Sequence, residues 1–206
     1  KDTSAWYHIL VQRDGSSSEI YVNGVQQELQ TETRASTNGY FNHTVAHNIG
    51  RFGGSGQHFD GYMAEMHFVD GTSLNPTSFG ETKAGIWIPK NYTGSHGTNG
   101  FYLPFDDSSA IGDDESANTN DFSNTNLAST DVVLDSPTNN FATMNVNDGN
   151  GPDMREGNLK PFGDTAQAVF EGFKGTFPMS SGKWYWEMNA ADVNNLMQVG
   201  ITPTTA

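Results

Sequence analysis

The residues best suited to chemistry are carboxylates and amides concentrated in the middle of this sequence. Between Gly100 and Glu156 acidic residues are frequent and the one basic residue is Arg155. Hard oxygen ligands in a flexible segment suit calcium, although their spacing is not that of an EF-hand. The alternative is a solvated turn whose Asp and Asn side chains cap backbone groups. The candidate calcium ligands are Asp106, Asp113, Asp114, Asn118 and Asn120.

A second group of side chains could bind sugars by stacking aromatic rings on them. These residues lie in polar stretches rich in Gly and Asn, which places them at loops. The alternative is that such rings plug the ends of a core. The candidate glycan-binding residues are Tyr40, Phe41, His43, His58, Tyr92 and His96. We assign the four tryptophans, which lie in strand patterns, to cores: Trp6, Trp87, Trp184 and Trp186.

Hydrolysis of a glycoside would need a different set of residues. Retaining enzymes use two carboxylates about 5 Å apart, which positions i and i+2 on one strand face can supply. The run 59–71 offers Glu65 and then His67, and Asp70 falls on the opposite face. The pair is missing, so we expect no catalytic residues and give Glu65 a structural hydrogen bond.

Composition narrows the classes of function further. The net charge of −14 argues against a nucleic-acid partner, because phosphate binding needs concentrated Lys and Arg. There are no cysteines, so disulfides and thiolate metal sites are excluded. No apolar run reaches the roughly 18 residues that membrane insertion requires. Abundant Gly and aromatic residues favour short strands joined by polar turns.

The strand pattern predicts an all-β fold. Two β-rich runs flank Asp14-Gly15, and the second run ends in Asn23-Gly24, which predicts a hairpin followed by another tight reversal. Further strands are expected over 59–71, 85–89, 100–105, 182–188 and 199–201. A short helical turn is expected within 75–81, with Thr77 as its cap.

These motifs resemble the laminin-G-like, or concanavalin A-like, lectin/glucanase sandwich. The resemblance is carried by Trp6–Arg13, Ile20–Gly24, Ile49–Arg51 and Phe59–Met66. It implies an antiparallel jelly-roll-like β-sandwich. Because it begins in the middle of such a sheet, we expect the sandwich to lack its N-terminal strands.

The following segments resemble a version of this fold found in tailed-bacteriophage virion proteins. They are Phe68–Glu81, Gly85–Lys90, Gly97–Leu103 and Asp135–Thr143. Ser181–Glu187 with Val199–Ile201 is similar to the start of a SPRY-like sandwich. The resemblance therefore implies three parts: a laminin-G-like sandwich over 1–105, an acidic connecting arm over 106–158, and a partial SPRY-like β module over 159–206.

The function implied is that of a non-enzymatic virion structural protein in a fibre, an appendage or the capsid surface. Its expected task is adhesion to host-surface glycans or cementing of neighbouring subunits, as a homo-oligomer beside other virion subunits. The expected location is the virion or another extracellular setting. Two alternatives stay open, because a shared fold does not fix a function. They are a secreted bacterial carbohydrate-binding protein and a polysaccharide depolymerase.

Overall fold

Antiparallel strands build the part of the chain that the computed structural model describes, and the all-β prediction is confirmed. The described residues are 5–15, 17–28, 42–53, 56–145, 153–162, 172–177, 179–189 and 199–201. Within these ranges the helical elements are two 3₁₀ turns, η1 (Pro76–Ser78) and η2 (Ser129–Asp131). None of the helices in the described ranges has the length and apolar character needed to cross a bilayer.

The first sheet is the predicted hairpin with one short strand added. It contains β1 (Ile9–Asp14), β2 (Ser17–Val22) and β3 (Val25–Gln26) in that order. Asn23 and Gly24 have φ values of 49° and 78°, which form the tight primed reversal that Asn-Gly favours. The Asn23 amide oxygen also accepts a hydrogen bond of 2.9 Å from the His8 backbone. The turn residues predicted this hairpin and the reversal after it, and the structure confirms both.

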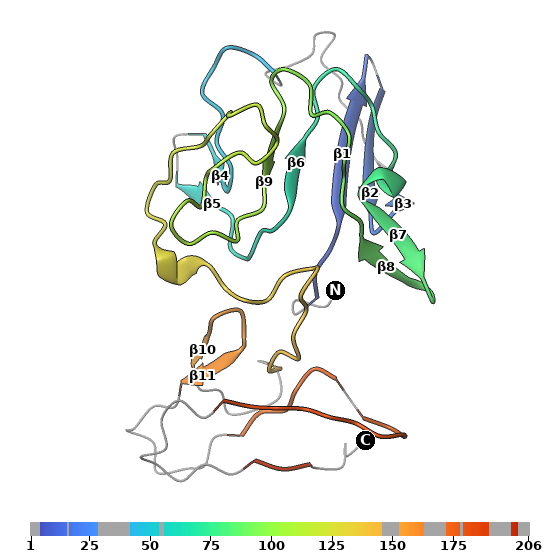
Figure 1. Cartoon of the computed structure of the whole chain (residues 1–206), viewed down its shortest axis with the longest axis vertical. Coiled ribbons are helices and arrows are strands. Elements are labelled where there is room, and N and C mark those ends of the chain that lie inside the picture. The colour runs from blue at the N-terminus through green and yellow to red at the C-terminus, as the bar shows by residue number, and fades with distance from the viewer. Residues whose placement is uncertain are drawn as a thin grey trace.

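The other sheets are two-stranded (Figure 1). β6 (Met66–Phe68) pairs with β9 (Phe101–Leu103), and β7 (Gly80–Lys83) pairs with β8 (Ile86–Pro89). β4 (Arg51–Phe52) pairs with β5 (Gln57–His58), and β10 (Asp153–Arg155) pairs with β11 (Lys160–Phe162). The last hairpin spans the boundary predicted between residues 158 and 159. The domain boundaries themselves stay predictions.

Trp87 on β8 joins the first sheet to the β7–β8 hairpin. Its ring stacks on His8 with a centroid separation of 5.7 Å. A Cβ added at Gly80 would lie 2.5 Å from the indole, and one added at Gly24 would also clash with it. Two glycines therefore make room for this ring, and Trp87 packs between two β layers, as a sandwich requires.

The buried apolar side chains of the described ranges are few. Leu103 on β9 is completely buried, and Leu10 and Ile111 are nearly so. Ile111 lies in the predicted arm, and Glu115 N donates to the Tyr102 carbonyl oxygen at 2.9 Å. The segment 106–124 thus lies against β9. Farther along, Asp135 accepts a hydrogen bond of 2.8 Å from the Trp6 indole.

Several local predictions are wrong. The strand expected over 59–71 is limited to Met66–Phe68, because Glu65 has a left-handed φ of 53° that ends the extended conformation. The η1 turn has Asn75, and not Thr77, at its N-cap. Residues 182–188 and 199–201 form no strand, and Trp184 and Trp186 are 57% and 50% exposed. Within the described ranges these two rings have no layer over them.

Candidate functional site

A cluster of rings centred on His67 brings together two of the candidate glycan-binding residues. The β6–β9 register pairs His67 with Tyr102, so both rings lie on one face, stacked at 4.3 Å. The His96 ring lies nearly parallel to both rings, with its centroid 5.3 Å from that of His67 and 6.3 Å from that of Tyr102. Tyr92 meets both His67 and His96 edge-on, at 5.9 Å and 5.1 Å. Residues from β6, β9 and the 90–97 loop therefore form one packed group.

The histidines of this cluster are linked and held neutral. His67 Nδ1 and His96 Nε2 lie 3.0 Å apart, so one ring donates a hydrogen bond to the other. Burial, followed by the charges of His96 and His8, lowers the pKa of His67 to about 4. Burial also lowers the pKa of His96 against an opposing effect of Asp114. At neutral pH the rings act as an uncharged aromatic stack.

This packing limits what Tyr92 and His96 can offer a sugar. His96 is only 7% exposed, and the Tyr92 hydroxyl donates to the Ser95 carbonyl oxygen at 2.9 Å. Both rings have their faces or edges against other rings, as expected of aromatic plugs at the end of a core. His43 and His58 are exposed, on the segment 42–48 and on β5. Tyr40 and Phe41 lie outside the described residues.

Glu65, the carboxylate considered for hydrolysis, is hydrogen-bonded to a phenol. The Tyr102 hydroxyl donates to Glu65 Oε2 at 2.6 Å. Burial first, and this hydrogen bond second, raise the pKa of Tyr102. The tyrosine therefore stays protonated and keeps donating. The geometry gives Glu65 the structural hydrogen bond that we expected from the sequence.

The candidate calcium ligands mostly satisfy backbone groups. The Asp114 carboxylate accepts hydrogen bonds of 2.8 Å each from the backbone N–H groups of Tyr102, Ser116 and Asn120. The amide nitrogens of Asn118 and Asn120 donate to the Gly100 carbonyl oxygen at 2.9 and 2.8 Å. These contacts fasten the acidic segment to the start of β9.

No ligand set emerges from these five residues in the described ranges. Asp106 and Asp113 are exposed, and no group of three or more His, Asp or Glu side chains there could hold a metal ion. Burial raises the pKa of Asp114, but the hydrogen bonds from Tyr102, Ser116 and Asn120 outweigh it and lower that pKa. The carboxylate is charged because backbone donors surround it.

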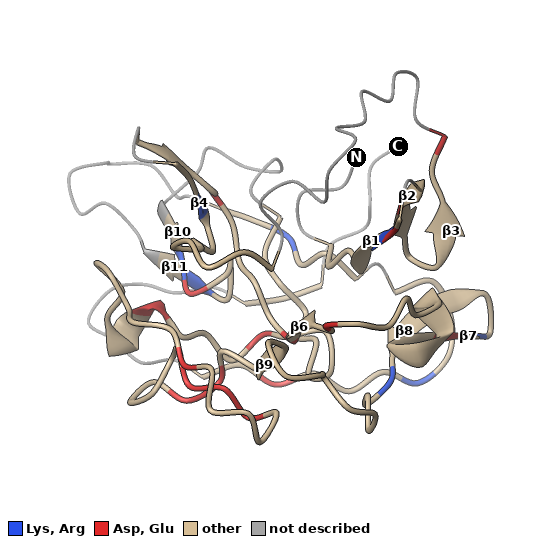
Figure 2. Cartoon of the chain, turned by 90° about the horizontal axis from the view of Figure 1, so that it is seen from above, with Lys and Arg blue, Asp and Glu red and all other residues tan. Residues whose placement is uncertain are grey.

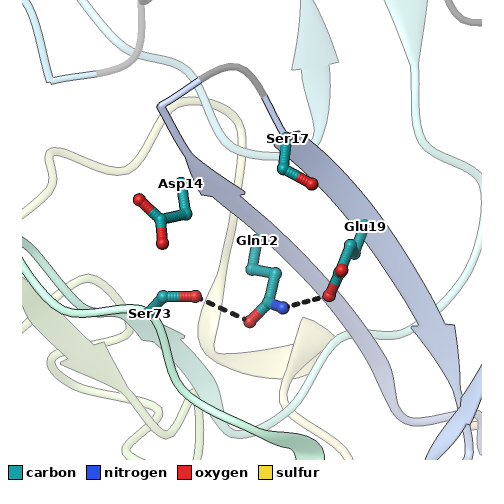
Figure 3. A pocket seen from close by; sticks show the side chains of 5 residues that line it. All are labelled: Gln12, Asp14, Ser17, Glu19 and Ser73. Atoms are coloured by element: carbon teal, nitrogen blue, oxygen red, sulfur yellow. Dashed lines mark hydrogen bonds between the residues drawn. The ribbon is translucent and has the colours of Figure 1, made fainter.

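A polar hollow lies at the tip of the first hairpin, and sequence reasoning missed it (Figure 3). Its volume is about 140 Å³. The register pairs Gln12 with Glu19 and Asp14 with Ser17, which puts four polar side chains on one sheet face. Ser73, from the loop after β6, completes the lining. The alternation in the hairpin could have indicated the first four residues, but no local signal places Ser73 beside them.

The comparisons with curated proteins and with solved structures find no match. The comparison with family models finds one that covers the first hairpin, the polar hollow, β6 and η1. The matched range also contains the segments on which the sequence resemblance was based, Trp6–Arg13, Ile20–Gly24, Ile49–Arg51 and Phe59–Met66. Residues 2–79 match the family model of the concanavalin A-like lectin/glucanases superfamily, so this part of the chain is similar to lectin and glucanase sandwiches.

Proposed function

We propose that this chain is a non-enzymatic, carbohydrate-binding structural component of a tailed-bacteriophage virion. The observation that carries the proposal is the match of residues 2–79 to a superfamily of lectins and glucanases. Lectins of this fold bind sugars without cleaving them, and glucanases add a carboxylate pair to the same scaffold. Whether this chain resembles the lectins or the glucanases therefore depends on whether it has such a carboxylate pair.

The residues around Glu65 favour binding over cleavage. Position 67, which would carry the second carboxylate, is a half-buried neutral histidine in the ring cluster. Glu65 itself is engaged by Tyr102 at 2.6 Å. A general acid and a nucleophile must both face the scissile bond, and neither role has a free candidate at this strand.

The proposed setting is a fibre, an appendage or the capsid surface. It is supported by the sequence resemblance of Phe68–Glu81 and Asp135–Thr143 to phage virion proteins. We further propose homo-oligomers beside other virion subunits. Apolar side chains exposed on the first sheet, including Ile9, Val11 and Val25, are in keeping with assembly. Repetition in a symmetric particle would stabilise a chain whose described ranges bury few apolar side chains.

A glycan array probed with the full chain tests the binding proposal, and release of reducing sugar from each bound polysaccharide tests the absence of catalysis. We expect binding without release. Release that Glu65→Gln abolishes would make the chain a depolymerase. The full reading frame and its genomic neighbours test the particle assignment, because a secreted bacterial lectin would lie outside any set of virion genes.

A further inference from the structure

Hydrogen bonds among its lining residues hold the polar hollow of the first hairpin in shape. Gln12 stands at its centre (Figure 3). The Ser73 hydroxyl donates to Gln12 Oε1 at 3.0 Å, and Gln12 Nε2 donates to Glu19 Oε2. The Tyr21 hydroxyl donates to the same Glu19 oxygen at 2.7 Å. The amide therefore links the hairpin to the loop after β6 and holds Glu19 in one position.

Two carboxylates keep acceptor capacity toward the hollow. Glu19 Oε2 receives both hydrogen bonds, so Oε1 has no partner among the described residues. The Asp14 carboxylate also has none there. Hydrogen bonds from Tyr21 and then Gln12 lower the pKa of Glu19, so it is ionised at neutral pH. Ser17 contributes a hydroxyl that can donate or accept.

We infer that this hollow binds adjacent hydroxyl groups of a neutral or amino sugar through Asp14 and Glu19, with Ser17 and Ser73 as secondary partners. This inference rests on the proposed function and names the site and the sugar class. Hydroxyl groups donate short, strong hydrogen bonds to carboxylates. Neighbouring hydroxyls on one ring can reach two acceptors that lie on adjacent strands.

The size of the hollow supports recognition of one sugar residue. Pockets that enclose a drug-sized ligand measure about 300–1,000 Å³, and this one measures about 140 Å³. It can hold the edge of a ring while the rest of a glycan stays in solvent. Tyr21 lies two residues beyond Glu19 on the same sheet face, so its ring is placed beside that edge.

The charge of the hollow restricts the sugar class. Asp14 and Glu19 are both acidic, and the lining contains no Lys or Arg. Figure 2 shows acidic residues on β1–β2 and, more densely, in the loops beside β9. A carboxylate or sulfate on the sugar would meet like charge without a compensating donor cation. We therefore expect uronic acids, sialic acids and sulfated sugars to be rejected.

The test uses a glycan array of neutral, amino and anionic sugars with the full chain and three variants. Asp14→Asn and Glu19→Gln each replace a carboxylate by an amide of the same shape. Glu81→Gln, an exposed residue of β7, is the matched control. We expect each hollow variant to weaken binding of neutral sugars roughly tenfold or more, and the control to bind as the parent does.

Amide chemical-shift mapping with the strongest monosaccharide then locates the site. Perturbations at residues 12–14, 17–19 and 73 support the inference. Binding that is unchanged in both hollow variants, or that maps elsewhere, overturns the inference and leaves the proposed function standing. An array without any bound sugar overturns both. Perturbation of the same residues by calcium alone, with no effect of sugar, would make the hollow a cation site and would also overturn the inference.

Discussion

At the scale of single residues, neighbours decide what each titratable group does. His67 is the clearest case, since its ring stacks on Tyr102, is hydrogen-bonded to His96 and lies near His8. The three histidines carry lowered pKa values, each chiefly because of burial. A proton added to any of them would be poorly solvated and would repel the next. The cluster is therefore stable only while it is neutral.

The first prediction concerns acid stability. Because the pKa of His67 is lowered to about 4 from an ordinary 6.5, the unfolded chain binds more protons between these values. Stability is then complete above pH 6.5 and falls as the pH drops toward 4. The slope should stay below about 1.4 kcal/mol per pH unit for this ring, since it is partly solvent-screened. Urea unfolding across this range measures it.

The variant His67→Phe keeps the stack on Tyr102 and removes the titrating group. We expect its unfolding free energy to change less between pH 6.5 and 4 than that of the parent. The exposed His58→Gln is the control and should keep the parent profile. If the unfolding free energy of the parent and of His67→Phe had the same pH dependence, the loss of stability in acid would arise outside this ring.

The second prediction concerns Asp114, which is 9% exposed and accepts three backbone N–H groups. Asp114→Ala leaves these donors without their partner, which should cost about 2 kcal/mol or more. Asp113→Ala, at the exposed neighbouring position, should change stability by about 0.5 kcal/mol at most. Both are measured by urea unfolding. A loss in Asp114→Ala that appears only with calcium would instead support a metal role.

At the scale of elements, local signals predicted the strands whose register is set by a turn. The Asp14-Gly15 and Asn23-Gly24 reversals identified β1, β2 and the return to β3. Short aromatic runs identified β8 and β9 in the same way. The left-handed φ of Glu65 and the identity of its hydrogen-bond partner, Tyr102, could not be predicted. The contact joins residues 37 positions apart, beyond the reach of a local pattern.

In the candidate sites, too, local patterns identified residues whose roles depend on contacts with distant parts of the chain. Tyr92 and His96 were found as aromatic loop residues, but only the β6–β9 pairing turns them toward His67. Asp114, Asn118 and Asn120 were found as oxygen-rich residues, and their use as backbone partners depends on β9. The hollow was missed since Ser73 reaches Gln12 across 61 positions.

The third prediction concerns how Trp87 packs the β7–β8 hairpin against the first sheet. Gly80 has no positive φ, so Gly80→Ala tests the close approach alone, where the added Cβ would lie 2.5 Å from the indole. Overpacking of this kind costs about 1–3 kcal/mol. Gly172→Ala, which meets nothing within 4 Å, should leave stability nearly unchanged. Equal effects of the two variants in urea unfolding would contradict the packing described for Trp87.

At the scale of the whole molecule, the net charge makes it possible to distinguish long-range electrostatic attraction from recognition by direct contact. The chain carries a net charge of −14, and its acidic residues gather in the loops beside β9, with a few more on β1–β2 (Figure 2). Such a field acts over a Debye length and is weakened by salt. The inferred hydrogen bonds from sugar hydroxyls to Asp14 and Glu19 would depend on contact and not on that field. The salt dependence of sugar affinity should therefore distinguish electrostatic attraction from direct contact.

The fourth prediction follows from this difference. Between about 50 mM and 500 mM salt the Debye length falls from roughly 14 to 4 Å. We expect affinity for a neutral sugar to change less than about twofold, because no charge on the sugar is screened. Affinity for the matching amino sugar should fall several-fold, since its ammonium group is attracted by the acidic surface. Isothermal titration at both salt concentrations measures the two affinities. A neutral sugar whose binding weakens as steeply as that of the amino sugar would contradict contact recognition and point to the protein's field instead.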